Sequence, residues 1–144
     1  METAVAKARA PRPDKQSGFT YSLENIMITR SEIFEYAEKT FGAKPDYPFK
    51  TYPHYAILRH LDDQKWFGLV MNVPKDKLGL EGEGDVDVID IKCHPDKVHD
   101  LKIKAGFLPA YHMNKEHWLT AVLDGSVTKE EVFSLLAESY ELTK

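Results

Sequence analysis

The segment AYHMNKEHW, residues 110–118, gathers two histidines, an asparagine, a lysine and a tryptophan between His112 and Trp118. These side chains offer donors for phosphate groups and base edges, and an aromatic ring that can stack on a base. The same residues also fit a structural interpretation, in which Trp118 and Met113 are core and Asn114 holds a turn. Composition alone favours the structural interpretation over binding.

Metal binding and nucleophilic catalysis are two further chemistries to consider. His112 and His117 are five residues apart, whereas a shared helix face needs a spacing of three or four. They can still converge across a tight turn, but the spacing fixes no third ligand. The lone Cys93 lies at a predicted strand end, where a cysteine is usually a small buried hydrophobe. We therefore expect a protein that is not an enzyme, with no catalytic residue, metal or cofactor.

Composition and charge narrow the class of protein. The chain has 144 residues, one cysteine and a formal net charge of −4. This length suits one domain, and a single cysteine fits a reducing cytoplasm. The sequence has no membrane-spanning apolar run and no signal peptide. We expect a cytoplasmic protein with no membrane association, whose acidic balance argues against general binding to nucleic acid.

Positive charge is concentrated in residues 91–104, where four lysines against two aspartates give 4 − 2 = +2. The preceding residues 75–90 give 2 − 6 = −4. Lys97 and Lys104 are seven residues apart, which places them on one face of a predicted helix. A solvated helix face is the simplest explanation, and contacts to phosphate are the alternative.

Hydrophobic periodicity predicts the elements that must position these residues. Residues 1–28 form an N-terminal extension, of which at least 1–18 is expected to be mobile because it has almost no large apolar side chains. Residues 29–144 form one domain. The expected helices are 29–42, 95–105 and a final one from 128 through 140, and the expected strands are 55–61, 65–73, 85–93, 107–113 and 117–123.

Capping signals locate the helix ends. Thr29 and Glu32 have capping-box spacing, and Gly42 suits a left-handed stop. Thr128 and Glu131 repeat the capping pattern at the final helix. Its inner stripe is Val132, Leu135, Leu136, Ser139 and Tyr140, and that of the middle helix, which begins at Pro95, is Val98, Leu101 and Ala105.

The order α-β-β-β-α-β-β-α indicates an α+β domain. We expect the first two strands to form a hairpin of two central strands. In the third strand the apolar alternation changes phase between Val88 and Ile89, which indicates a bulge or burial on both faces. Hairpins joined in this order predict a two-layer fold, an antiparallel sheet with helices on one face.

Several motifs resemble the YjbR/MmcQ family of small bacterial proteins. They are KCHP at 92–95, AYHMNKEHW at 110–118, LDGSV at 123–127 and SYEL at 139–142, with YAILRH, KWFGLVMNVP and LGLEGEG upstream. The resemblance covers roughly residues 29–143. It departs at His94, where the family usually has an acidic residue that would cap the second helix. It implies a two-layer α+β fold similar to secretion-chaperone or frataxin-like sheets. It also implies DNA binding, because the family's sheet is likened to a double-wing DNA-binding motif.

We therefore expect a non-catalytic DNA-binding or nucleic-acid-associated protein. The candidate binding residues are Lys92, His112, Asn114, Lys115, His117 and Trp118, with Lys97 and Lys104 as auxiliary phosphate contacts. The alternative is a protein-interaction or chaperone-like adaptor with a protein partner, and the third interpretation is small-ligand or metal binding at the histidine turn. We also expect Trp118 to be substantially buried, since it begins an apolar strand.

Overall fold

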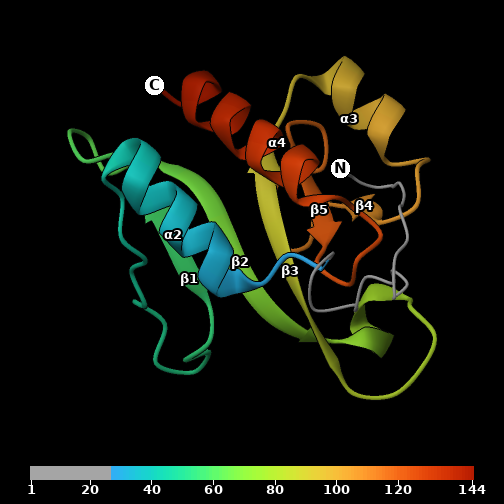
Figure 1. Ribbon diagram of the computed structural model, residues 1–144. Coiled ribbons are helices and arrows are strands. Elements are labelled where there is room, and N and C mark those ends of the chain that lie inside the picture. Colours follow the sequence, from blue (N-terminus) through green and yellow to red (C-terminus); the bar gives the residue numbers. More distant parts are fainter. Residues whose placement is uncertain (1–26) are drawn as a thin grey trace, which may run out of the picture.

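A computed structural model describes residues 27–144 (Figure 1), so the predicted mobile tail 1–18 lies outside the described residues. The helices are α2 (Arg30–Phe41), α3 (Pro95–Leu101) and α4 (Lys129–Leu142), with a 3-10 helix η1 (Lys75–Leu78). The strands are β1 (Ala56–Arg59), β2 (Trp66–Pro74), β3 (Asp85–Lys92), β4 (Phe107–Pro109) and β5 (Trp118–Val122). The predicted order of helices and strands and the α+β class are confirmed. No helix between residues 27 and 144 combines the length and apolar character that crossing a membrane requires.

The five strands form one antiparallel sheet in the order β1-β2-β3-β5-β4. The prediction of two central strands is correct for β2 and wrong for β1, which lies at an edge. The pattern misleads because Ala56, Ile57 and Leu58 are fully buried, as in a central strand. A loop, not another named strand, covers the outer side of β1 through an isolated bridge between Asp46 and Ile57.

The helices lie on one face of the sheet, with α2 and α4 in front of the strands in Figure 1. The capping box of α2 is present: Thr29 Oγ1 accepts a hydrogen bond from Glu32 N at 3.2 Å, and Glu32 Oε1 accepts one from Thr29 N at 2.9 Å. At α4 one half of this arrangement is present, since Thr128 Oγ1 accepts from Glu131 N at 3.1 Å. Local sequence therefore determines where these two helices begin.

The middle helix is shorter than predicted. α3 ends at Leu101, Ala105 is exposed, and Lys104 lies in the turn beyond the helix. The chain must return to β4 at this point through Gly106, whose φ is 92°. A Cβ on Gly106 would lie 2.6 Å from Val127 Cγ2, so both backbone conformation and packing require glycine here. His94 gives α3 no side-chain cap, as its departure from the family pattern suggests.

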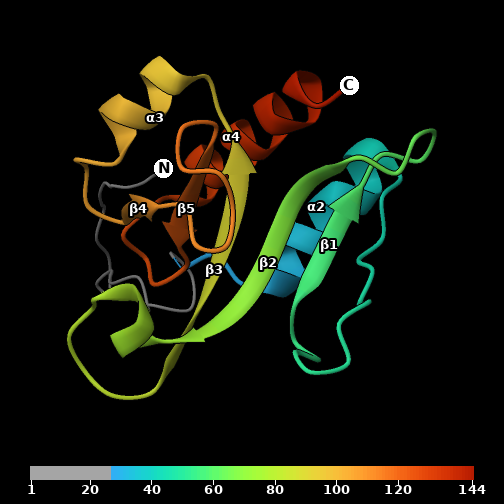
Figure 2. The same cartoon turned by 180° about the vertical axis from the view of Figure 1, so that it is seen from behind.

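The opposite face of the sheet is turned to the viewer in Figure 2, where the loop between β4 and β5 passes in front of β5. Phe49, Tyr111 and Met113 pack there on a second apolar cluster. The buried members of this cluster are Tyr55, Ile57, Leu69, Met71, Val73, Val86, Val88 and Val122. The phase change in β3 therefore reflects burial on both faces, because its register with β2 and β5 is continuous and the sheet's register shift lies between β1 and β2, where Phe67 has no partner on β1.

Candidate nucleic-acid interface

The 110–117 loop is closed by Asn114. Its side-chain Oδ1 accepts hydrogen bonds from Glu116 N at 2.9 Å and His117 N at 3.1 Å. Its main-chain carbonyl oxygen accepts one from Trp118 N at 2.9 Å. These are the bonds that a turn-forming asparagine makes. They occupy the amide oxygen that would otherwise be available to a base edge.

The two histidines of this loop are both exposed and have different surroundings. His112 has a left-handed backbone, with φ 70°, and its ring centroid lies 4.0 Å from that of Tyr111 and 6.3 Å from that of Tyr55. The carbonyl oxygen of His117 accepts a hydrogen bond from Cys93 N at 2.9 Å. In the part of the chain that the structure describes, no three His, Cys, Asp or Glu side chains are grouped as metal ligands.

Trp118 is only 9% exposed, which confirms the prediction that it is buried. It pairs with Lys92 in the register of β5 and β3, so both side chains lie on the same face of the sheet. Lys92 is half-buried, and its backbone N–H donates to Ser139 Oγ on α4 at 2.9 Å. The structure thus brings together two of the residues proposed from the sequence.

Lys92 and Trp118 belong to an open pocket of about 330 Å³. We name it the lysine–tryptophan pocket; its described lining is Lys65, Trp66, Lys92, Met113, Trp118, Leu142, Thr143 and Lys144. It is formed where β2 and β5 begin and where β3 and α4 end. Lys65, Trp66 and Lys144 were not predicted from the sequence, because they come from distant segments that only the folded chain brings together.

The two auxiliary lysines have a different environment and are absent from the described pocket lining. Lys97 Nζ lies 2.7 Å from Glu138 Oε1, and Lys104 Nζ lies 3.3 Å from Glu131 Oε2. Both glutamates belong to α4, so each ion pair joins that helix to the α3 region. Lys115, in contrast, is exposed, and among residues 27–144 no carboxylate lies within ion-pair distance of it.

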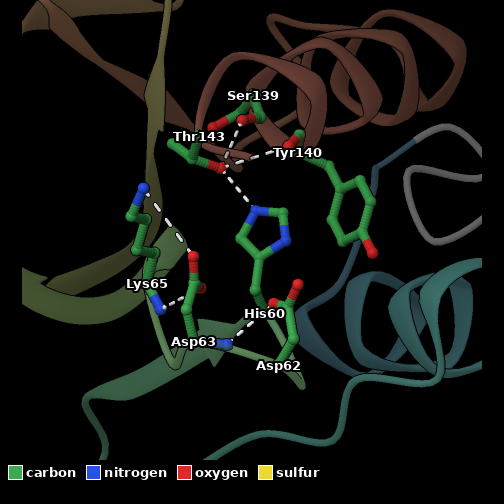
Figure 3. Close-up of polar contacts among 7 residues, drawn as sticks. All are labelled: His60, Asp62, Asp63, Lys65, Ser139, Tyr140 and Thr143. Carbon is green, nitrogen blue, oxygen red and sulfur yellow. Dashed lines mark hydrogen bonds and ion pairs between the residues drawn. The ribbon is translucent and has the colours of Figure 1, made fainter.

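A buried polar network holds the wall of the pocket formed by the end of α4 (Figure 3). Thr143 Oγ1 lies 2.8 Å from Ser139 O, which can only accept, so the hydroxyl donates there and accepts from His60 Nε2 at 2.7 Å. The His60 ring stacks on Tyr140 with centroids 4.2 Å apart. Ser139 Oγ donates to Phe67 O at 2.6 Å. These bonds tie α4 to the β1–β2 hairpin.

A buried carboxyl group lies behind the 110–117 loop. Asp90 is fully buried, and its Oδ1 accepts from the Thr120 hydroxyl, which itself accepts from Tyr111 N at 2.9 Å. Within residues 27–144, Asp90 Oδ2 has no hydrogen-bond partner. Burial raises the pKa of Asp90 to about 7, against the lowering effects of the Thr120 hydrogen bond and the Lys115 charge. Asp90 was not among the residues predicted from the sequence, although its position between Ile89 and Ile91 indicates burial.

Cys93 is not suited to nucleophilic chemistry. Its side chain is buried, and burial raises the pKa of the thiol to about 11. The group is therefore protonated at neutral pH, whereas the thiolate is the nucleophile. This agrees with the interpretation of Cys93 as a small core residue.

Known proteins share this architecture. The YjbR family model matches residues 39–142. Protein YyaQ of Bacillus subtilis (strain 168) is 44% identical over 118 residues, covering 82% of this chain and 100% of YyaQ. A crystal structure of a Pseudomonas syringae protein, also 44% identical, superposes with a TM-score of 0.79 over 81% of this chain and 100% of that chain. The Deinococcus radiodurans protein DR2400, at 22% identity and a TM-score of 0.62 over 81% of this chain and 78% of that chain, shares the fold. From this agreement in sequence and fold, the chain belongs to the YjbR family.

Proposed function

We propose that the protein binds nucleic acid without acting on it chemically, and that the lysine–tryptophan pocket is the centre of the binding surface. One observation carries this proposal: three lysines and two tryptophans gather at one concave surface, and none of the eight described lining residues is acidic. Lysines attract phosphate, whereas aromatic rings offer stacking surfaces for bases. The pairing of these two residue types favours nucleic acid over a simple anion.

The pocket lining is positively charged, with three lysines, although the formal net charge of the whole chain is −4. Within residues 27–144, the ion-pair partners of Lys65 and Lys144 are exposed and close in sequence: Asp63 at 3.7 Å and Glu141 at 3.3 Å. Exposed pairs of this kind contribute little free energy, so a phosphate can replace the carboxylate at small cost. Within the described chain, no carboxylate lies within ion-pair distance of Lys92.

The end of α4 is the feature of the pocket that opposes an anion. Carbonyl groups in the last turn of a helix carry partial negative charge and repel phosphate. Here Ser139 O accepts from the Thr143 hydroxyl at 2.8 Å, and Glu141 O accepts from Lys144 N at 3.4 Å. These bonds reduce the repulsion, and the Lys144 ammonium group adds positive charge at the same helix end.

A binding titration tests the proposal. Fluorescence anisotropy of labelled mixed-sequence DNA, both duplex and single-stranded, is measured at low salt and again at higher salt. We expect binding at low salt, and we expect Lys92→Ala to weaken it. Loss of one phosphate contact should also reduce the log–log salt slope by about 0.9 for duplex and about 0.7 for single-stranded DNA.

Lys97→Ala is the matched control, because Lys97 has an ion pair with Glu138 on α4 and is not among the described pocket residues. It should leave binding unchanged. Equal losses for Lys92→Ala and Lys97→Ala would point to diffuse attraction and not to the pocket. No binding of the unmodified protein at low salt would contradict the proposal and favour the protein-partner interpretation.

A further inference from the structure

We infer that the lysine–tryptophan pocket receives a single unpaired nucleotide of a strand, with the base against the tryptophans and the phosphate at the lysines. This inference rests on the proposed function and specifies its ligand. It predicts that single strands, frayed ends or extruded bases are bound in preference to an intact duplex.

The size of the pocket supports one nucleotide. Its volume of about 330 Å³ lies at the lower end of the range of roughly 300–1,000 Å³ for small-molecule sites. A base in a duplex is stacked on its neighbours and paired, so it can enter such a pocket only after leaving the stack. An unpaired base does not have that cost.

The pocket lining has an apolar part and a positively charged part, which match the base and the phosphate of a nucleotide. Trp66, which is half-buried, and Met113 provide apolar surface against which a base can lie, and Trp118, at 9% exposed, adds a small part of its ring. Stacking on such surfaces tolerates every base. Lys65, Lys92 and Lys144 provide ammonium groups, which bind phosphate as point charges. A free phosphate would use only the lysines, and a nucleoside would use only the apolar walls.

The backbone of the walls is anchored before any ligand arrives. The main-chain N–H of Trp118 donates to Asn114 O, the main-chain N–H of Lys92 donates to Ser139 Oγ, and the Thr143 hydroxyl accepts from His60 Nε2. Preorganised walls reduce the entropy lost on binding. The pocket is therefore suited to a small ligand that makes only a few contacts.

The chain's own tryptophans provide the test. The sequence contains only two, Trp66 and Trp118, and both line the pocket. Their indole N–H signals in a ¹⁵N-labelled full-length protein are followed by NMR during titration with deoxyadenosine monophosphate, inorganic phosphate or deoxyadenosine. We expect the nucleotide to shift both signals, with an affinity at least about ten-fold above that of phosphate or nucleoside alone.

Competition then connects the pocket to the strand. Deoxyadenosine monophosphate should displace labelled single-stranded DNA, and Lys92→Gln should weaken both ligands, whereas Lys97→Gln, outside the described pocket lining, should weaken neither. Trp66→Phe keeps a ring at a half-buried position and should weaken the nucleotide without affecting phosphate.

The outcomes separate the two proposals. DNA that binds without competition from the nucleotide would overturn this inference and leave nucleic-acid binding standing. Phosphate that binds as tightly as the nucleotide would make the pocket an anion site and also overturn the inference. A nucleotide that binds while no DNA does would overturn both the proposed function and this inference, because the pocket would then hold a free nucleotide and not one unit of a strand.

Discussion

Lys92 and Lys97 are five residues apart in sequence, yet their surroundings differ. Lys92 ends β3 in a pocket with Trp118, whereas Lys97 lies on α3 with its ammonium group 2.7 Å from Glu138 of α4. Both lysines belong to the positive segment 91–104, which sequence alone treats as one feature. The difference teaches that a lysine's availability to phosphate depends on partners 26 or more residues away, such as Trp118 and Glu138.

Removing the aromatic wall beside Lys92 should have the largest effect. Trp118 is 9% exposed, so Trp118→Ala should lower the free energy of unfolding by about 3–5 kcal/mol. Urea unfolding followed by circular dichroism measures the loss. A variant as stable as the parent protein would show that the ring contributes no packing and serves only as a stacking surface.

Lys115 lies in a third environment, because its charge acts on the buried carboxyl group of Asp90. Burial raises the folded-state pKa of Asp90 from 3.8 to about 7, so the folded protein retains a proton that the unfolded chain releases. The resulting stabilisation is complete below about pH 4 and is lost as pH rises to about 7. Between these values the loss is roughly 1.4 kcal/mol per pH unit.

Asp90→Asn should remove the pH-dependent stabilisation that comes from the Asp90 proton, since an amide does not titrate in this range. Urea unfolding at several pH values should show that the variant gains stability relative to the parent protein as pH rises from 4 to 7. Asp100→Asn, at an exposed position in α3, is the control and should follow the parent curve. Identical pH dependence for Asp90→Asn would mean that Asp90 is ionised at little cost.

Asn114→Ala should have an intermediate effect, because it removes the side-chain oxygen that closes the 110–117 loop. We expect a loss of roughly 0.5–2 kcal/mol, by comparison with helix-cap substitutions. Sequence preference in DNA binding should stay the same, since Oδ1 accepts from two backbone N–H groups. A changed preference at unchanged melting temperature would assign Asn114 to base recognition.

The ion-paired lysines should show the smallest effects. Lys97→Ala and Lys104→Ala each remove an exposed ion pair with α4, which should cost less than about 1 kcal/mol. Neither change should affect DNA affinity. A measurable loss of affinity in both variants would eliminate the distinction between the two groups of lysines.

Local sequence was sufficient for features that depend on neighbouring residues. The caps at Thr29 and Thr128, the left-handed Gly42 and the inner stripe of α4 are all as predicted, because a helix end or face is determined within a few residues. The length of α3 was not, because its end depends on the packing of Gly106 against Val127.

Sequence by itself determined the fold class, the order of elements and the presence of a chemically rich loop at residues 110–117. Tertiary structure decided which residues of that loop face a pocket, which lysines are neutralised, and that Asp90 is buried. The physical reason is the separation in sequence over which each interaction acts, since hydrophobic periodicity and capping involve residues only a few positions apart. A pocket and a buried charge, in contrast, result from contacts such as Lys92 with the end of α4 and Lys97 with Glu138, whose partners are 41 or more residues apart.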